Sequence, residues 1–477
     1  MAERTKLKKF SEFAASLLPH ETSYLLSIEQ FQDEDRLQIL EIVHQVANDP
    51  SKADLLNSDI DKRKYSHLKN WIEEHLTEIN VDFQFDWIAS TLQQILKDSL
   101  TAEDERKILK IVKSEDTNQF YFTKFFDLLS EYQQYLLIRL RYQDHLTIHE
   151  FVVKYRDLYD KNKLTFDKLY TATVDIIDQY SNKGGESIHW ETVLKEIFYD
   201  ESLEGYLRYM ALVRLTFIHF NYHDFEGLTK EYDLIDEWFK KGRFYSKRIL
   251  LNYYSNRLLL HARFKEYDKA IYFGYLSIRQ KNNDYIHYVN NLCALLLRTN
   301  KNQEALKIMR EAYPEMRQTP SFHNKIGFIS FYMRCLMNNQ QFKNAENFAE
   351  TFLKAYKQEI FKYRWHIFFS AYLESVLSQN KYDKIIKIVR SYQLLEKDRN
   401  YQNKATYIPT ISWYYAVSAF KEGLIDKASL TEIITEYLKS LENSPERGSQ
   451  LENMISGLKK HMPTVLMNLN LNNLLGS

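Results

Sequence analysis

The chain has 477 residues, of which 44% are hydrophobic, and its 64 lysines and arginines balance its 64 aspartates and glutamates. This length exceeds what one compact core usually accommodates, so we expect two domains or an elongated array. The zero net charge excludes a global field of the kind that draws proteins onto nucleic acid or anionic membranes. Partners are therefore expected to be recognised by local features of the surface.

Glycine and proline are scarce in the first half of the chain, where the first glycine is Gly184 and no proline lies between Pro50 and Pro314. Because these residues punctuate strands and turns, their scarcity predicts helix after helix joined by short polar turns. The two cysteines, Cys293 and Cys335, are too few for a disulfide framework and stand in apolar segments. We expect buried, reduced thiols.

The N-terminus carries basic residues, but Ser11 and Glu12 interrupt its apolar stretch, and no convincing cleavage site follows. No window of eighteen apolar residues occurs, so no membrane span is predicted. The expected location is the cytoplasm.

Residues 1–60 predict an N-terminal segment of two amphipathic helices, the second of which ends at Asp49-Pro50-Ser51. Residues 61–182 predict a further helical region, in which degenerate repeats are one interpretation. Its expected helices span Tyr65–Ile79, Asp86–Asp98, Ala102–Val112, Gln119–Arg141, Ile148–Tyr159 and Phe166–Tyr180. The stretch from Ser181 to Ser187 then reads as a domain boundary or as a long loop within one solenoid.

From residue 188 to 440 a helix-turn-helix pattern recurs. Each unit has an apolar helix, a polar turn of about six residues and a second helix that we expect to open on a marker residue. The markers are Leu228, Ala270, Ala305, Ala345, Ile385 and Ala428, which lie 42, 35, 40, 40 and 43 residues apart. An apolar or aromatic residue stands three positions before each marker except Ala305: Phe225, Tyr267, Phe342, Tyr382 and Ile425. Such pairs stack their apolar faces, because one pair cannot bury its own.

A small residue at the start of a second helix, after a polar turn, resembles the pattern of tetratricopeptide-repeat proteins over about residues 200 to 440. The match is divergent, because most units exceed that family's period of about 34 residues. Leu258, Met333 and Leu373 also stand where the family keeps a small residue in the first helix, which Cys293 and Ala416 preserve. The resemblance implies an all-α fold, an α-α superhelix or helical-repeat solenoid preceded by an N-terminal helical region.

The same resemblance implies that a protein or peptide binds in a groove lined mostly by first helices. The candidates are polar and aromatic residues that we expect to face solvent there: Asn252, Asn256, Asn290, Asn291, Tyr332 and Arg334. Asparagine can hydrogen-bond a ligand backbone without reading its sequence. The predicted function is a non-enzymatic adaptor or scaffold without a cofactor.

The alternative is a nucleic-acid-associated helical-repeat protein that uses a basic edge between repeats. Its candidates lie in one loop and the helix start after it: Lys240, Lys241, Arg243, Lys247 and Arg248. Such a loop, interleaved with aromatic residues, could contact phosphates and bases, although cations near helix ends also simply complement the helix dipole. At the extreme, Arg214 and His219 have the Arg-x4-His spacing of HEPN ribonucleases, but Leu215 replaces the usual polar residue.

Two histidine pairs, His145 with His149 and His219 with His223, have the four-residue spacing that can place two metal ligands on one helical face. We expect neither pair to lie on one helix, because His145 precedes a helix that begins near Ile148 and His223 follows the end of another. The sequence therefore predicts no metal site. It also lacks a glycine-rich phosphate loop and a nucleophile elbow.

Residues 441–477 predict a C-terminal helix that ends near His461, followed by an apolar tail. The apolar residues of the tail are Val465, Leu466, Leu469, Leu471, Leu474 and Leu475. The tail either caps the last repeat or docks into a partner. The pattern makes no prediction of oligomeric state.

Overall fold

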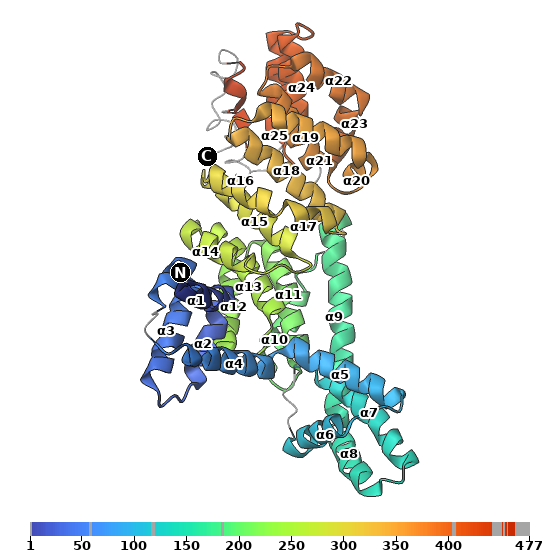
Figure 1. The fold of residues 1–477 in the computed structure, drawn as a ribbon. Helices are drawn as coiled ribbons and strands as arrows, with labels where there is room; N and C mark the ends of the chain where they lie inside the picture. The colour runs from blue at the N-terminus through green and yellow to red at the C-terminus, as the bar shows by residue number, and fades with distance from the viewer. Residues whose placement is uncertain are drawn as a thin grey trace. The chain divides into compact units, whose positions relative to one another are not determined.

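The computed structural model describes residues 2–56, 60–115, 120–182, 186–402, 407–440, 451, 454–455 and 457–462. Within these residues the chain forms helices and no strand (Figure 1). The predicted all-α, solenoid-like class is confirmed. None of the helices described combines the length and the apolar composition that crossing a bilayer requires. The predicted apolar tail lies outside the described residues, as do residues 183–185 of the predicted boundary stretch.

The chain divides into two compact units, Met1–Phe264 and Lys265–Ser477. The described helices of the first unit are α1 (Ala2–Ser16), α2 (Pro19–Ile28), α3 (Glu34–Asn48), the 3-10 helix η1 (Pro50–Leu55), α4 (Lys62–Ile79), α5 (Val81–Leu96), α6 (Ala102–Ser114), α7 (Phe122–Ile138), α8 (Tyr142–Lys154), α9 (Arg156–Asn182), α10 (Trp190–Tyr199), α11 (Gly205–Tyr222), α12 (Phe225–Lys240) and α13 (Lys247–Arg263). Helix α7 is the centre of one core, since Phe122, Phe125 and Phe126 are fully buried among residues of α5, α6 and α8.

The N-terminal helices pack against the α12 and α13 helices of the same unit. The His20 ring on α2 lies between two hydrogen-bond partners, with Nδ1 2.7 Å from the Tyr254 hydroxyl and Nε2 2.8 Å from Asp236 Oδ1. The neighbouring Glu21 carboxylate accepts a hydrogen bond from the Tyr245 hydroxyl. Buried polar contacts therefore tie residues near the N-terminus to residues more than 200 positions later.

Two predicted helix boundaries between residues 61 and 182 are wrong. The helix expected to begin near Ile148 begins at Tyr142 and ends at Lys154. Helix α9 then continues through the segment that we read as a turn between Tyr159 and Phe166. Asn162 explains the continuity, because its buried amide donates to the Leu158 carbonyl and accepts from the backbone N–H of Glu204. The side chain of Asn162 is thus hydrogen-bonded inside the first unit.

The second unit consists of first helices, second helices and short helices between the pairs. In the described residues they are α14 (Tyr267–Ser277), α15 (Tyr285–Arg298), α16 (Asn302–Glu311), α17 (Tyr313–Gln318), α18 (Phe322–Asn338), α19 (Phe342–Ala355), α20 (Lys357–Tyr363), α21 (Trp365–Leu377), α22 (Tyr382–Ser391), α23 (Leu394–Tyr401), α24 (Thr410–Lys421) and α25 (Lys427–Ser440). The first helices α15, α18, α21 and α24 pack in series. The second helices α16, α19 and α22 each pack against their own first helix and the next one, which is the arrangement of a solenoid (Figure 1).

The short helices α17, α20 and α23 separate one pair from the next. They account for the period of about 40 residues, because two helices and their turn need only about 34. Although the segment Lys357–Tyr363 is rich in charged residues, it forms the helix α20. Its apolar Ile360 is fully buried, which explains why the segment is helical.

The recurring turn has one backbone geometry. Each turn contains one residue with a positive φ between 59° and 70°: His223, Lys265, Asn300, Gln340, Asn380 and Gly423. In several turns the next residue donates its N–H to the carbonyl five positions earlier, as from Lys301 to Leu296 at 2.8 Å. This is the Schellman arrangement that ends a helix.

The second helices begin earlier than expected. Helices α12, α14, α16, α19 and α22 start at the residue three positions before the marker, so Ala305 and Ala345 lie within the first turn. Both alanines are fully buried, whereas Ala428 is exposed. Except for Ala428, the markers are therefore packing positions in the first turn of the second helix, and the αL residue before them ends the first helix.

Candidate functional site

One face of α18 collects polar side chains from neighbouring first helices. Gly327 and Arg334 are seven residues apart and therefore share this face. A Cβ atom at Gly327 would lie 2.7 Å from Arg364 Nη1 and 3.3 Å from Asn290 Nδ2. Glycine thus leaves room for Asn290 of α15 and Arg364, the residue before α21, to meet over α18.

Three side chains from successive first helices form what we name the polar row: Arg334 of α18, Glu374 of α21 and Tyr414 of α24. The Arg334 Nε atom is buried and has no hydrogen-bond partner among the described residues. Burial raises the pKa of the Glu374 carboxyl, and the nearby Arg334 guanidinium opposes that rise. Burial, with the charge of Glu374, also raises the pKa of the Tyr414 hydroxyl.

The other predicted groove residues of the second unit have different surroundings. Asn290 is only 4% exposed, and its side-chain amide donates to the Asn324 carbonyl at 3.1 Å. The expectation that Asn290 faces solvent is therefore wrong. Asn291 is half-buried, and its Nδ2 lies 3.4 Å from His287 Nε2. Tyr332 packs its ring against Phe348 of α19, with centroids 5.0 Å apart, and therefore faces a second helix. Of these four residues, only Arg334 belongs to the polar row.

Asn252 and Asn256 belong to the first unit. Asn252 Oδ1 accepts hydrogen bonds from the Tyr209 hydroxyl at 3.0 Å and from Asn256 Nδ2 at 3.2 Å. Both side chains are half-buried and link α13 to α11.

Sequence reasoning missed Glu374 and Tyr414. One signal was present, because Glu374 is the only acidic residue in the apolar helix Trp365–Leu377. A carboxylate in such a helix is costly to bury and therefore merits attention.

The basic edge consists mainly of cations paired within the first unit. Lys240 Nζ lies 2.8 Å from Asp236 and 2.7 Å from Glu237, and Arg248 Nη2 lies 2.8 Å from Asp82. Arg243 lies 3.5 Å from Glu201 and stacks over Trp238. Lys247 lies 3.8 Å from Glu21, and Lys241 is exposed. Most of this positive charge is therefore balanced by carboxylates of the same unit.

One of the two histidine pairs lies on a single helix, contrary to our prediction. His145 and His149 both lie on α8, and their rings stack with centroids 5.6 Å apart, which corrects the prediction that they do not share a helix. His223 follows the end of α11, as predicted, and its ring packs against Phe225.

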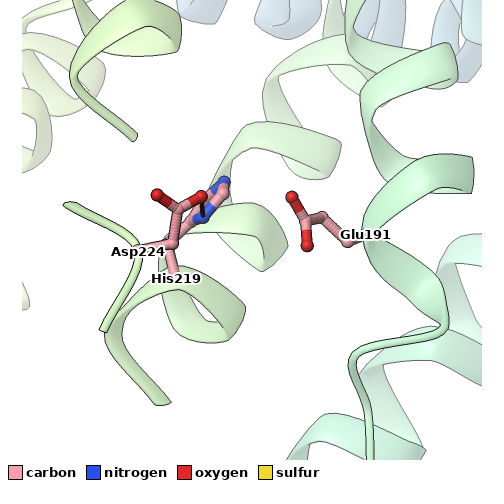
Figure 2. A group of neighbouring side chains, drawn as sticks. All are labelled: Glu191, His219 and Asp224. Atoms are coloured by element: carbon pink, nitrogen blue, oxygen red, sulfur yellow. Dashed lines mark ion pairs between the residues drawn. The ribbon is translucent and has the colours of Figure 1, made fainter. Parts of the chain in front are cut away.

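His219 instead meets two carboxylates, Glu191 of α10 and Asp224 at the start of α12. One ligand atom from each of the three side chains lies within 4.8 Å of the other two. Figure 2 shows both carboxylates directed toward the His219 ring, with His219 Nδ1 3.0 Å from Asp224 Oδ2. We name these three residues the His219 cluster. Burial lowers the pKa of His219, and the two carboxylates oppose that effect.

No family model matches the chain, and no curated protein is significantly similar to it. The tetratricopeptide resemblance therefore rests on the helix pairs and turns of the chain itself.

Arg214 and His219 have contacts with different helices. Arg214 Nε donates to the Leu169 carbonyl at 2.9 Å and to Thr173 Oγ1 at 2.7 Å, both on α9. Its Nη1 also donates to the Met210 carbonyl. The guanidinium thus anchors α9 on α11, while His219 faces α10 and α12.

Proposed function

We propose that this protein is a non-enzymatic adaptor that holds a segment of another protein along the polar row of its second unit. The observation that carries the proposal is the buried Nε of Arg334, which lacks an acceptor among the described residues. A buried, unmade hydrogen bond costs about 1–3 kcal/mol, and a ligand oxygen that inserts among the surrounding side chains would recover that energy.

The polar row offers complementary groups from three consecutive first helices. Arg334 donates to a carbonyl or carboxylate oxygen, and Glu374 accepts from a backbone or side-chain N–H. An extended peptide presents both kinds of group, so it fits a row whose members belong to neighbouring repeats. Selectivity would come from the area buried over several repeats.

The charge pairing of the basic edge favours this adaptor over the nucleic-acid alternative. Lys240, Arg243 and Arg248 each have a carboxylate within 3.5 Å, so phosphate contacts would have to replace existing ion pairs. The buried free thiols of Cys293 and Cys335 are in keeping with the cytoplasmic location that we propose.

Affinity purification from the native host with mass spectrometry tests the proposal. The wild-type chain is compared with Arg334→Ala and Glu374→Gln, and with Arg310→Ala as the matched control, because Arg310 is exposed on the second helix α16. Circular dichroism first establishes that each variant is folded. We expect a reproducible partner whose recovery falls at least tenfold in both polar-row variants and is unchanged in the control.

A peptide from that partner should then bind the purified chain, and Arg334→Ala should weaken the binding by about 1.5–3 kcal/mol, the value of a charged hydrogen bond. Equal recovery of every partner by wild type and both polar-row variants would refute this placement of the site.

A further inference from the structure

We propose that Glu191, His219 and Asp224 bind one divalent cation of the zinc class in the first unit. The site is separate from the polar row, and it does not depend on the adaptor role. Its ligand set combines one imidazole nitrogen with two carboxylate oxygens, and both kinds of group are zinc ligands in proteins.

The first observation is that His219 lacks a hydrogen-bond partner. The side chain is 1% exposed, and neither ring nitrogen has a hydrogen bond within the described residues. Nδ1 is 3.0 Å from Asp224 Oδ2, but without the geometry of a hydrogen bond. Two ligands of a tetrahedral zinc ion are about 3.3 Å apart and point at the ion rather than at each other. The approach of His219 and Asp224 fits such a pair.

The second observation is the spacing of the ligand atoms. They lie within 4.8 Å of one another, whereas two ligands of a tetrahedral zinc ion are about 3.3 Å apart. A movement of up to about 1.5 Å closes the difference. The half-buried Glu191 side chain has the rotatable bonds to supply it (Figure 2).

The recurring turn positions Asp224. His223 adopts the left-handed conformation, so the Asp224 N–H donates to the His219 carbonyl at 3.1 Å and the carboxylate returns over the ring. Asp224 Oδ1 accepts from the Gly227 N–H at 3.0 Å, which leaves Oδ2 toward His219. A Cβ at Gly227 would lie 2.3 Å from Oδ2 and 3.1 Å from His219 Cε1. Glycine therefore keeps this space open.

The local charge favours a cation. Lys195 Nζ lies 2.6 Å from Glu191 Oε1 and interacts electrostatically with Asp224 and Glu231 as well, so one ammonium faces three carboxylates. The buried Glu231 Oε2 also has no hydrogen-bond partner in the described part of the chain. The Asp224 side chain is 46% exposed, which gives an ion a path inward. A nitrogen ligand selects Zn²⁺ or Co²⁺ over Mg²⁺ and Ca²⁺, which prefer oxygen.

The test is a titration of the full-length, chelator-treated chain with Zn²⁺ in competition with a chromophoric chelator. We expect one ion per chain, and Glu191→Gln and Asp224→Asn should each weaken binding at least tenfold. The matched control is His223→Asn, because asparagine tolerates the positive φ and His223 lies outside the cluster. A second control, His149→Ala, removes the exposed member of the histidine pair on α8.

Lys195→Met separates a metal site from a purely structural ion pair. Removing the ammonium that competes for Glu191 should raise the Zn²⁺ affinity several-fold, whereas loss of a structural ion pair would not. Co²⁺ should give the absorption of a tetrahedral site, which Asp224→Asn should abolish, while Mg²⁺ and Ca²⁺ should not compete. The proposal would be overturned if the wild-type chain did not bind Zn²⁺, or if Glu191→Gln and Asp224→Asn bound it as tightly as the wild type. Loss of binding in His149→Ala would also overturn it.

Discussion

The contact between His20 and the α12 and α13 helices allows a quantitative test of how the first unit is held together. In His20→Ala, the hydrogen bonds to Tyr254 at 2.7 Å and to Asp236 at 2.8 Å are both lost. A neutral buried hydrogen bond contributes about 1 kcal/mol and one to a charged group about 1.5–3 kcal/mol. The expected loss is therefore about 3 kcal/mol in the attachment of α2.

Hydrogen exchange with mass spectrometry measures that loss locally in the full-length chain. About 3 kcal/mol corresponds to exchange that is roughly a hundredfold faster, and this change should be confined to α2 and the parts of α12 and α13 that it contacts. The control is His67→Ala, because His67 is exposed on α4. If the protection of α2 in His20→Ala stayed within threefold of wild type, the two hydrogen bonds would not hold the N-terminal helices in place.

Three further predictions concern acid sensitivity, a turn and a glycine. Burial raises the pKa of Asp236, but hydrogen bonds from His20, Lys240 and Tyr253 lower it below its ordinary value of 3.8 overall. This stabilisation is present above about pH 4 and is lost as the pH falls further, so α2 should lose protection from exchange in acid, with a flatter profile in Asp236→Asn. Gln340 has a φ of 62°, so Gln340→Gly should raise the urea midpoint by the equivalent of about 0.5–1 kcal/mol, whereas Gln341→Gly, at a φ of −99°, should lower it. A Cβ at Gly205 would lie 2.6 Å from ring atoms of both Phe120 and Phe244, so Gly205→Ala should destabilise the first unit by about 1–3 kcal/mol in urea unfolding, while Gly457→Ala, with open space around it, should be nearly neutral.

The recurring turn could be predicted because its causes are local. A helix ends where a residue takes the left-handed conformation, and the residues around it are polar wherever the turn is exposed. In five turns the second helix starts three residues before the predicted position, because one left-handed residue completes the turn and the helix begins two residues after it. In four of the six turns an aromatic residue three positions before the marker, such as Tyr267 or Phe342, opens the next helix.

The polar positions could not be predicted, because their partners are distant in sequence. Asn290 reads as an exposed groove residue until the Asn324 carbonyl, 34 positions later, accepts its amide proton. Likewise, Glu191 comes 28 residues before His219 and lies on another helix. The four-residue spacing of histidines therefore paired His219 with His223 as possible metal ligands and did not detect Glu191. Spacing along one helix cannot detect a cluster built from three helices.

The short helices α17, α20 and α23 also affect how the chain can change over time. They lie between helix pairs, so a residue gained or lost there alters the spacing of the pairs along the chain without shifting the buried faces of α15, α18 or α21 against each other. We therefore expect the array to tolerate insertions and deletions at these positions while each pair stays in register with the next. The length of the repeat should therefore vary more readily than the packing of one first helix against the next.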